Sequence, residues 1–181
     1  MRFLKYLYHQ HVRVARRDRL LYRAIYRQRP RQLVQVGLGD GTRTMQMLAF
    51  AARHAGAEGL AFAGIDLFEA RPTNQPGMTY REAHRQLGSL VDQLSLVPGD
   101  PYTALSRAAN RLLRTDMLVI SAGHDPASLK HGWLYVPRML HEKSIVLVEE
   151  RGPGVSCFRQ MDAAEIAHLA ADVSVPRKRA A

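Results

Sequence analysis

The sequence predicts an α/β protein with a doubly wound, mostly parallel sheet. From residue 32 onward, short apolar runs typical of strands buried on both faces alternate with helical stretches. Since each run is separated from the next by a helical segment, consecutive strands should be parallel, with helices on both faces of the sheet. Strands are expected at 33–36, 60–65, 94–97, 117–120 and 144–148, and helices near 42–54, 78–93, 102–114 and 127–140.

Composition is consistent with one globular domain. The chain has 181 residues, of which 46% are hydrophobic and 23% charged, so it can bury a sizeable core. No run approaches the roughly 18 consecutive apolar residues that a membrane-spanning helix requires. The single cysteine, Cys157, excludes an internal disulfide and a cysteine-based zinc site. We therefore expect a cytoplasmic protein.

The formal net charge of +10 lies mainly at the two ends of the chain. Residues 1–31 hold ten of the 26 Lys and Arg residues and a single acid, Asp18. A body of nearly balanced charge follows over residues 32–176, and 177–181 form a basic tail. This division favours a domain that binds a small molecule and carries a basic arm. It is less typical of a domain that binds the phosphate backbone of a nucleic acid over a whole face.

The basic arm, residues 1–31, is expected to be helical because residues 2–28 contain no glycine or proline. Three interpretations of it remain open. Its Leu, Tyr and Ile stripe could pack on the body and leave the arginines in water. It could instead rest on an anionic membrane surface, which would make the protein peripheral at a membrane, or contact nucleic acid.

In doubly wound sheets, ligands bind beyond the carboxyl ends of the strands. The first predicted strand ends in a glycine-rich turn, Gly37-Leu38-Gly39-Asp40-Gly41, where missing side chains let a ligand approach the backbone. The second ends in Asp66, whose carboxylate could accept hydrogen bonds from both hydroxyls of a ribose. Together these two features indicate a nucleoside ligand.

Several of these segments resemble motifs of the class I S-adenosylmethionine-dependent methyltransferases. Gln35–Gly41 is similar to their first motif, Gly64–Phe68 to the acidic strand end that holds the donor's ribose, and Val97–Asp100 to the segment that frames adenine. Ile120–His124 resembles the Ile-Asp-Gly-x-His fourth-strand end of one subgroup, and Ile145–Glu150 its fifth strand. The resemblance spans about residues 32–160.

This resemblance implies a Rossmann-like methyltransferase fold with S-adenosylmethionine as the cofactor. It places cofactor binding at Gln35, Gly37, Gly39, Gly41, Asp66, Leu67, Gly99, Asp100 and Ser121. Methyl transfer to oxygen or nitrogen can require a base, and His124 is the first candidate, with Glu149 and then Glu150 behind it. The methyl acceptor, a small molecule or a macromolecule, stays unidentified, as does the oligomeric state.

The chain also departs from the family pattern. Gln35 stands where an acid is usual, and Ser121 replaces the aspartate that ligates a divalent ion in metal-dependent relatives, so we expect no metal. The closing strands after the fifth are expected to be mostly absent. These losses leave two functions open: a metal-independent methyltransferase, or a non-catalytic methyltransferase-like protein that uses its basic arm to contact a membrane or nucleic acid.

Overall fold

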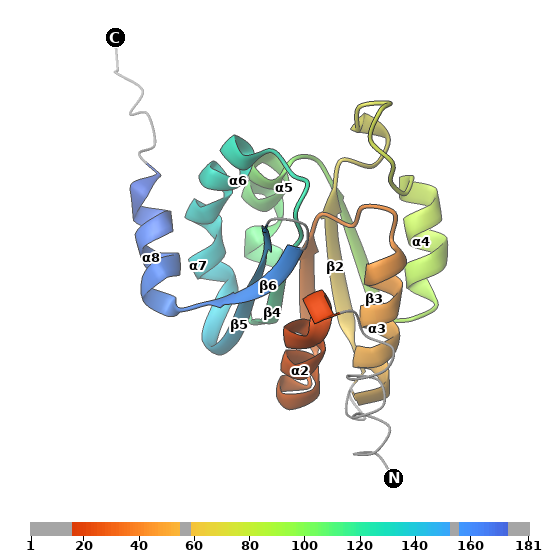
Figure 1. Ribbon diagram of the computed structural model, residues 1–181, viewed down its shortest axis with the longest axis horizontal. Coiled ribbons are helices and arrows are strands. Elements are labelled where there is room, and N and C mark those ends of the chain that lie inside the picture. Colours follow the sequence, from red (N-terminus) through yellow and green to blue (C-terminus); the bar gives the residue numbers. More distant parts are fainter. Residues whose placement is uncertain (1–15, 55–58, 153–155, 174–181) are drawn as a thin grey trace.

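A computed structural model describes residues 16–54, 59–152 and 156–173 of the chain. It contains one six-stranded sheet in the order β3-β2-β1-β4-β5-β6 (Figure 1). The first five strands are mutually parallel and β6 is antiparallel to β5. The predicted doubly wound, mostly parallel sheet is therefore confirmed. The strands are β1 (Gln32–Val36), β2 (Ala61–Asp66), β3 (Gln93–Pro98), β4 (Thr115–Ile120), β5 (Leu140–Arg151) and β6 (Ser156–Met161).

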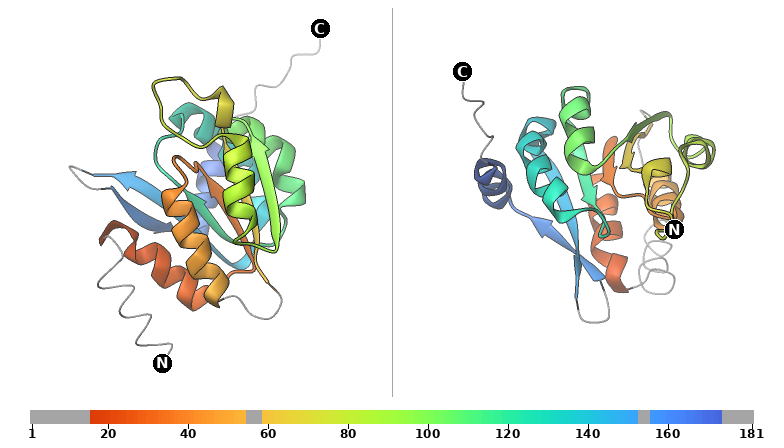
Figure 2. Two further views of the ribbon diagram at one scale, coloured as in Figure 1. Left: turned by 90° about the vertical axis from the view of Figure 1, so that its right-hand side faces the viewer. Right: turned by 90° about the horizontal axis from the view of Figure 1, so that it is seen from above.

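Helices cover both faces of this sheet (Figure 2). On one face, α2, α3 and α4 contribute to a core that includes Leu33 and Phe62; on the other, α5 to α8 pack over Val34 and Ile65. The helices are α2 (Arg19–Gln28), α3 (Thr42–His54), α4 (Tyr80–Gly88), α5 (Pro101–Ala108), α6 (Pro126–Gly132), α7 (Val136–Met139) and α8 (Ala163–Asp172), with short 3₁₀ turns η2 (Arg16–Asp18), η3 (Phe68–Ala70), η4 (Ala109–Arg111) and η5 (Trp133–Tyr135).

The C-terminal part differs from expectation. The prediction that the closing strands are mostly absent was wrong for one of them, because β6 pairs with β5 from Val146↔Met161 to Arg151↔Ser156. The sheet therefore does not stop at the fifth strand. The six residues of β6 include an arginine and a glutamine, and only Phe158 and Met161 are buried. The segment consequently lacks the alternating apolar pattern that would have revealed it.

Three helical predictions were too long. The helix expected near 102–114 ends at Ala108, where the 3₁₀ turn η4 follows. The fourth helix begins at Tyr80, after a Thr79–Glu82 capping box, and ends at Gly88. The helix expected near 127–140 is divided into α6, η5 and α7. Gly132 and Pro137 lie at these breaks, and proline removes a donor from the helical hydrogen-bond ladder.

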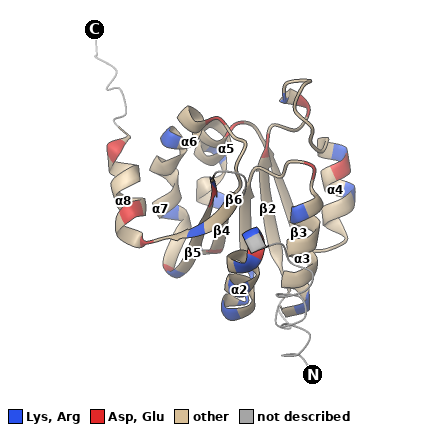
Figure 3. Cartoon of the chain, in the orientation of Figure 1, with Lys and Arg blue, Asp and Glu red and all other residues tan. Residues whose placement is uncertain are grey.

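The described part of the basic arm is an integral helix of the domain. Leu21, Tyr22, Ala24 and Ile25 of α2 are buried in the core beside α3. Arg23 and Arg27 of the same helix are exposed, and Figure 3 shows Lys and Arg along it. This arrangement agrees with the first interpretation for residues 19–28, while residues 1–15 and 174–181 lie outside the described part. No helix in the described ranges is both long enough and apolar enough to span a bilayer.

Candidate functional site

The strand register brings the predicted site residues to one edge of the sheet. Val36 is level with Ile65 on one side and with Ile120 on the other, and Asp66 is level with Pro98. The segments after β1, β2, β3 and β4 therefore meet at the carboxyl edge. Two adjoining cavities open there, and they share Gly37, Gly39, Ala122 and Arg151 as wall residues.

The first cavity has a volume of about 620 Å³. It brings together most of the predicted binding residues from the ends of β1, β2 and β3, and it also reaches His124 after β4. Its walls are Val36, Gly37, Gly39, Ile65, Asp66, Leu67, Arg71, Pro72, Gln75, Pro76, Gly99, Asp100, Pro101, Ala122, Gly123, His124, Asp125 and Arg151.

The second cavity, of about 490 Å³, holds the other predicted residues, Gln35, Ser121 and Glu149. Gly41 lines neither of these two cavities. Side chains from the N-terminal segment and α3 complete the walls, which comprise Arg17, Asp18, Gln35, Gly37, Leu38, Gly39, Asp40, Thr42, Arg43, Gln46, Ser121, Ala122, Glu149, Arg151 and Ser156.

The glycine turn depends on backbone conformations that favour glycine. Gly37, Gly39 and Gly41 have φ angles of +83°, +59° and +77°. At Gly41 space is also limiting, because a Cβ there would overlap the sulfur of Met78. Met78 donates its N–H to the Gly39 carbonyl over 2.9 Å, so the loop after β2 folds back onto the glycine turn.

Asp66 joins this turn to β2. Its Oδ2 accepts N–H bonds from Leu38 at 2.6 Å and Gly39 at 3.1 Å. Its Oδ1 accepts the Leu67 N–H at 2.6 Å and a hydrogen bond from the Arg71 guanidinium. The side chains of Asp66 and Arg71 are 7% and 10% exposed, so this ion pair is buried inside the wall of the first cavity.

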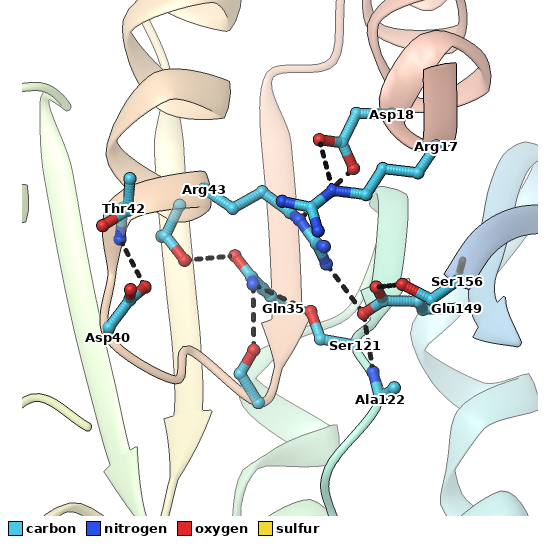
Figure 4. A network of polar contacts seen from close by, with 12 residues as sticks. Arg17, Asp18, Gln35, Asp40, Thr42, Arg43, Ser121, Ala122, Glu149 and Ser156 are labelled. Carbon is cyan, nitrogen blue, oxygen red and sulfur yellow. Dashed lines mark hydrogen bonds and ion pairs between the residues drawn. The ribbon is translucent and has the colours of Figure 1, made fainter. Parts of the chain in front are cut away.

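Gln35 and Ser121 form a buried polar connection between β1, β4 and α3 (Figure 4). The Gln35 amide nitrogen donates to the Gly37 carbonyl at 2.9 Å and to the Ser121 hydroxyl at 3.1 Å. Its carbonyl oxygen accepts the Thr44 hydroxyl at 3.0 Å. The amide thus holds the glycine turn and Ser121 through its nitrogen and α3 through its oxygen, and no ionised group is needed to satisfy Ser121.

Glu149 is bound by three donors (Figure 4). Oε2 accepts from Arg43 Nη1 at 2.7 Å and the Ala122 N–H at 2.8 Å, and Oε1 accepts the Ser156 hydroxyl at 2.6 Å. Burial alone would raise the pKa of Glu149, but these hydrogen bonds and the charge of Arg43 outweigh it and lower the pKa to about 2. A carboxylate with this pKa is a poor proton acceptor near neutral pH.

The N-terminal segment reaches the same network through Asp18. Asp18 Oδ1 lies 3.3 Å from Arg43 Nε, and Oδ2 lies 3.6 Å from Arg17 Nε. Burial raises the pKa of Asp18, and the two arginines only partly offset this effect. Arg43 therefore lies between two carboxylates, Asp18 and Glu149, and its guanidinium also lies 5.3 Å from the centre of the Phe158 ring.

One ring nitrogen of His124 is able to accept a proton. Its Nδ1 lies 2.7 Å from the Ser121 carbonyl oxygen, which can only accept, so Nδ1 carries the proton in the neutral ring and Nε2 has the lone pair. Burial lowers the pKa of His124 below its ordinary value, although the Ser121 hydrogen bond opposes this change. The ring is accordingly a neutral base at pH 7, in the wall of the first cavity.

Gly99 and Asp100 also form hydrogen bonds within the protein. Gly99, with φ +137°, donates its N–H to the Asp66 carbonyl at 2.9 Å. Asp100 caps α5 through the Thr103 N–H at 3.2 Å and accepts the Ser128 hydroxyl. Burial opposes ionisation of Asp100, but these hydrogen bonds outweigh it and lower its pKa to about 2. Asp125 caps the next helix, α6, with Pro126 at its first position.

Four arginines line the two cavities, and none of them was a predicted site residue: Arg17, Arg43, Arg71 and Arg151. Arg71 could have been suspected because it follows Asp66 by five residues in a turn-rich segment. Arg43 gave no comparable indication, since its partner Glu149 is 106 residues away. In a chain with 26 Lys and Arg residues, such long-range pairs are not encoded locally.

The polar side chains near Ser121 are bonded to other groups of the protein. The Ser121 hydroxyl accepts from the Gln35 amide, and Glu149 is held by Arg43. Within the described ranges, no group of three or more His, Cys, Asp or Glu side chains is arranged to hold a metal ion. A hard cation prefers several oxygen ligands, and here the Arg43 guanidinium already pairs with the carboxylates of Asp18 and Glu149.

Comparison with known proteins identifies the fold. No protein-family model matches the chain, and no curated protein does. Among solved structures, an O-methyltransferase from Bacillus cereus in complex with SAH aligns with a TM-score of 0.56 and 13% identity, over 81% of this chain and 64% of that one. The tomaymycin-synthesis O-methyltransferase TomG from Streptomyces achromogenes, in complex with SAM, aligns with a TM-score of 0.51 and 12% identity, over 72% and 53%.

A third structure is described as a precorrin 8w decarboxylase from Methanobacterium thermoautotrophicum, with a TM-score of 0.50 and 18% identity over 77% of this chain and 64% of that one. The chain therefore has the Rossmann-like fold of the class I S-adenosylmethionine-dependent methyltransferases. It spans 53–64% of the length of these three structures. At such low identity the likeness concerns the fold, and function must be argued from the site.

Proposed function

We propose that the protein binds S-adenosylmethionine across the two cavities and transfers its methyl group to an acceptor without a metal ion. The observation that carries this proposal is the junction of the glycine turn with Asp66 at the carboxyl ends of β1 and β2, in the wall of a cavity of about 620 Å³. Such a cavity is of the size that encloses a small-molecule ligand.

In this proposal the nucleoside end of the donor lies in the first cavity and its amino-acid end in the second. Asp66 accepts the ribose hydroxyls, and Leu67, Gly99 and Asp100 line the adenine side. The glycine turn brings backbone groups close to the donor, while Gln35 and Ser121 face its amino-acid end in the second cavity. The donor supplies an electrophilic methyl group, so the main task of the protein is alignment of donor and acceptor.

His124 is the base that we assign to the acceptor's proton, because its Nε2 has a lone pair at neutral pH. We assign Glu149 a holding role instead of proton transfer, since three donors and a pKa of about 2 leave it little basicity. Through the Ala122 N–H it fixes the segment between β4 and His124. Activity should accordingly be insensitive to a metal chelator.

Calorimetric titration with S-adenosylmethionine and S-adenosylhomocysteine tests the nucleoside site. The wild type is expected to bind both, and Asp66→Ala to bind neither, because the ribose hydroxyls lose their acceptor. A variant of an exposed acid away from the cavities, Glu142→Ala, serves as the control and should bind like the wild type. Failure of a folded wild type to bind either compound would contradict the proposal.

The transfer step is tested with donor labelled in the methyl group and a small-molecule extract as the source of acceptor. His124→Asn is expected to reduce label transfer about 10²–10⁴-fold, since a general base typically contributes this factor. Its affinity for S-adenosylhomocysteine should change little. Label transfer by the variant at the wild-type rate would remove His124 from the mechanism.

A second candidate function is non-catalytic binding to a polyanion through the basic arm. It is favoured by the exposed Arg23 and Arg27 on α2 and by the absence of any acid from the sequence of residues 19–31. The apolar face of α2 is already buried, so contact of this helix with a membrane or nucleic acid would be electrostatic. Salt-dependent binding to anionic vesicles or RNA, lost when Arg23 and Arg27 are replaced by glutamine, would support it.

A further inference from the structure

The ribose-accepting position is occupied by the protein's own groups. A carboxylate offers about four lone-pair positions. Those of Asp66 are taken by the N–H groups of Leu38, Gly39 and Leu67 and by the Arg71 guanidinium. In this conformation Asp66 has no capacity left for two ribose hydroxyls. Nucleoside binding as proposed above therefore requires one of these donors to leave.

Arg71 is the donor that can leave. The other three are backbone amides, two in the glycine turn and one in the residue that follows Asp66. Arg71 instead lies immediately before an exposed loop, residues 72–77, and its long side chain reaches Asp66. A Cβ at Gly77 would overlap this guanidinium, so the loop provides the space that the inward position of Arg71 needs.

In the first cavity the carboxylates have hydrogen-bond partners within the protein, whereas one arginine has no carboxylate partner among the described residues. The carboxylates are engaged: Asp66 as above, Asp100 by Thr103 and Ser128, and Asp125 by the N-terminal amides of α6. Arg151 lines both cavities, and none of the carboxylates in the described ranges forms an ion pair with it. In the first cavity Arg151 is therefore a cationic donor outside any described ion pair, and few acceptors are free.

We propose that Arg71 couples donor binding to an acidic methyl acceptor, an inference that rests on the proposed function. Ribose hydroxyls replace Arg71 on Asp66, and the released guanidinium, together with Arg151, binds a carboxylate or phosphate group of the acceptor. Paired guanidinium groups suit such anions because they can donate two parallel hydrogen bonds to each. By linkage, an anion that holds the released Arg71 raises the affinity for the nucleoside by the same factor.

The test is titration of S-adenosylhomocysteine into wild type, Arg71→Gln and the control Arg81→Gln, an exposed arginine on α4 outside both cavities. Each titration is repeated with inorganic phosphate or acetate at constant ionic strength. Without added anion, Arg71→Gln is expected to bind about tenfold tighter than the wild type, because the competitor for Asp66 is gone. With the anion, the affinity of the wild type and of Arg81→Gln should rise about fivefold and that of Arg71→Gln should not change.

The outcomes separate this inference from the proposed function. If neither the wild type nor Arg71→Gln binds S-adenosylhomocysteine, the proposed function fails. If both bind equally and respond equally to anions, only the coupling is overturned. A fall in wild-type affinity on addition of phosphate would assign the arginines to the donor's own carboxylate and overturn the acidic acceptor. The relative responses to phosphate and acetate indicate which anion the acceptor carries.

Two further variants keep the test decisive. Should Arg71→Gln fail to fold, Arg71→Lys retains the charge but loses the planar fork, and it should bind S-adenosylhomocysteine more tightly than the wild type with a weaker anion response. Arg151→Gln is expected to lose most of the anion response. An unchanged response in Arg151→Gln would contradict its part in the anion site.

Discussion

Two buried carboxylates at the same edge of the sheet, Asp66 and Glu149, use the same chemistry in different ways. Each is paired with an arginine and accepts at least one backbone N–H. The arginine partner of Asp66 is five residues away, in an exposed loop. The partner of Glu149 is 106 residues away on α3, and its third donor, Ser156, belongs to β6.

Because the two partners of each pair are separated by such different lengths of chain, loss of the two ion pairs has different consequences for the fold. Rupture of the Asp66–Arg71 pair releases one side chain before a loop that is already exposed, and Asp66 keeps its three backbone donors. Rupture of the Glu149 contacts separates α3, the segment after β4 and β6 at one point, and it leaves Arg43 buried with less compensation. The first pair is suited to exchange with a ligand, and the second stabilises the fold.

The largest expected effect is on stability, when the arginine of each pair is replaced by glutamine. Arg43→Gln should lower the free energy of unfolding by about 3 kcal/mol, since the buried carboxylates of Asp18 and Glu149 lose the cation that they share. Arg71→Gln should cost only about 1 kcal/mol, because Asp66 keeps its three backbone N–H donors. Urea unfolding of the two variants beside the wild type measures both values. Equal losses would break the comparison.

A smaller effect is expected from pH. Glu149 has a folded-state pKa of about 2, below its ordinary value of 4.5, so it binds fewer protons in the folded than in the unfolded state at intermediate pH. Its contribution to stability is complete above pH 4.5 and is lost as the pH falls toward 2. The wild type should lose about 1–3 kcal/mol more than Glu149→Gln over this range.

Urea unfolding at a series of pH values measures that difference. Other acids with lowered pKa values, such as Asp100, contribute equally to both proteins and cancel in it. Parallel stability curves for the wild type and Glu149→Gln would show that Glu149 is not held as an anion.

The smallest expected loss of stability comes from removal of one hydrogen-bond donor, the Ser156 hydroxyl. Ser156→Ala removes the hydroxyl bound to Glu149 Oε1 and should cost about 1 kcal/mol, the usual net value of one hydrogen bond. Ser106→Ala, on the exposed side of α5, removes a hydroxyl bonded only within its own helix and should cost less. Thermal unfolding of the pair decides this, and a larger cost for Ser106→Ala would argue against the role of β6 in holding Glu149.

The main elements of the fold were predictable because their determinants are local. Runs such as Met117–Ile120 are apolar on both faces, and the glycines after β1 mark the turn at the strand end. The meeting of this turn with Asp66 follows from parallel topology alone. β6 escaped prediction because its stability comes from pairing with β5 rather than from its own apolar pattern.

Parts of the candidate site could not be predicted for a related reason. Glu149 was expected to act as a base, but basicity depends on neighbours, and its neighbours Arg43 and Ser156 come from other elements. The saturation of Asp66 likewise depends on where the Arg71 side chain turns. Sequence patterns indicated which strand ends carry acids, whereas the contacts that determine how free those acids are come from side-chain packing.

The long reach of the Glu149–Arg43 pair also bears on how the chain folds during synthesis. With translation at about 5–20 residues per second, the 106 residues that separate the two partners take about 5–20 s to make. Throughout that interval Asp18 and Arg43 lack the acid that completes their network, and central strand β1 lacks β4 for most of it. The sheet of the nascent chain therefore stays incomplete until β5 and β6 have been made.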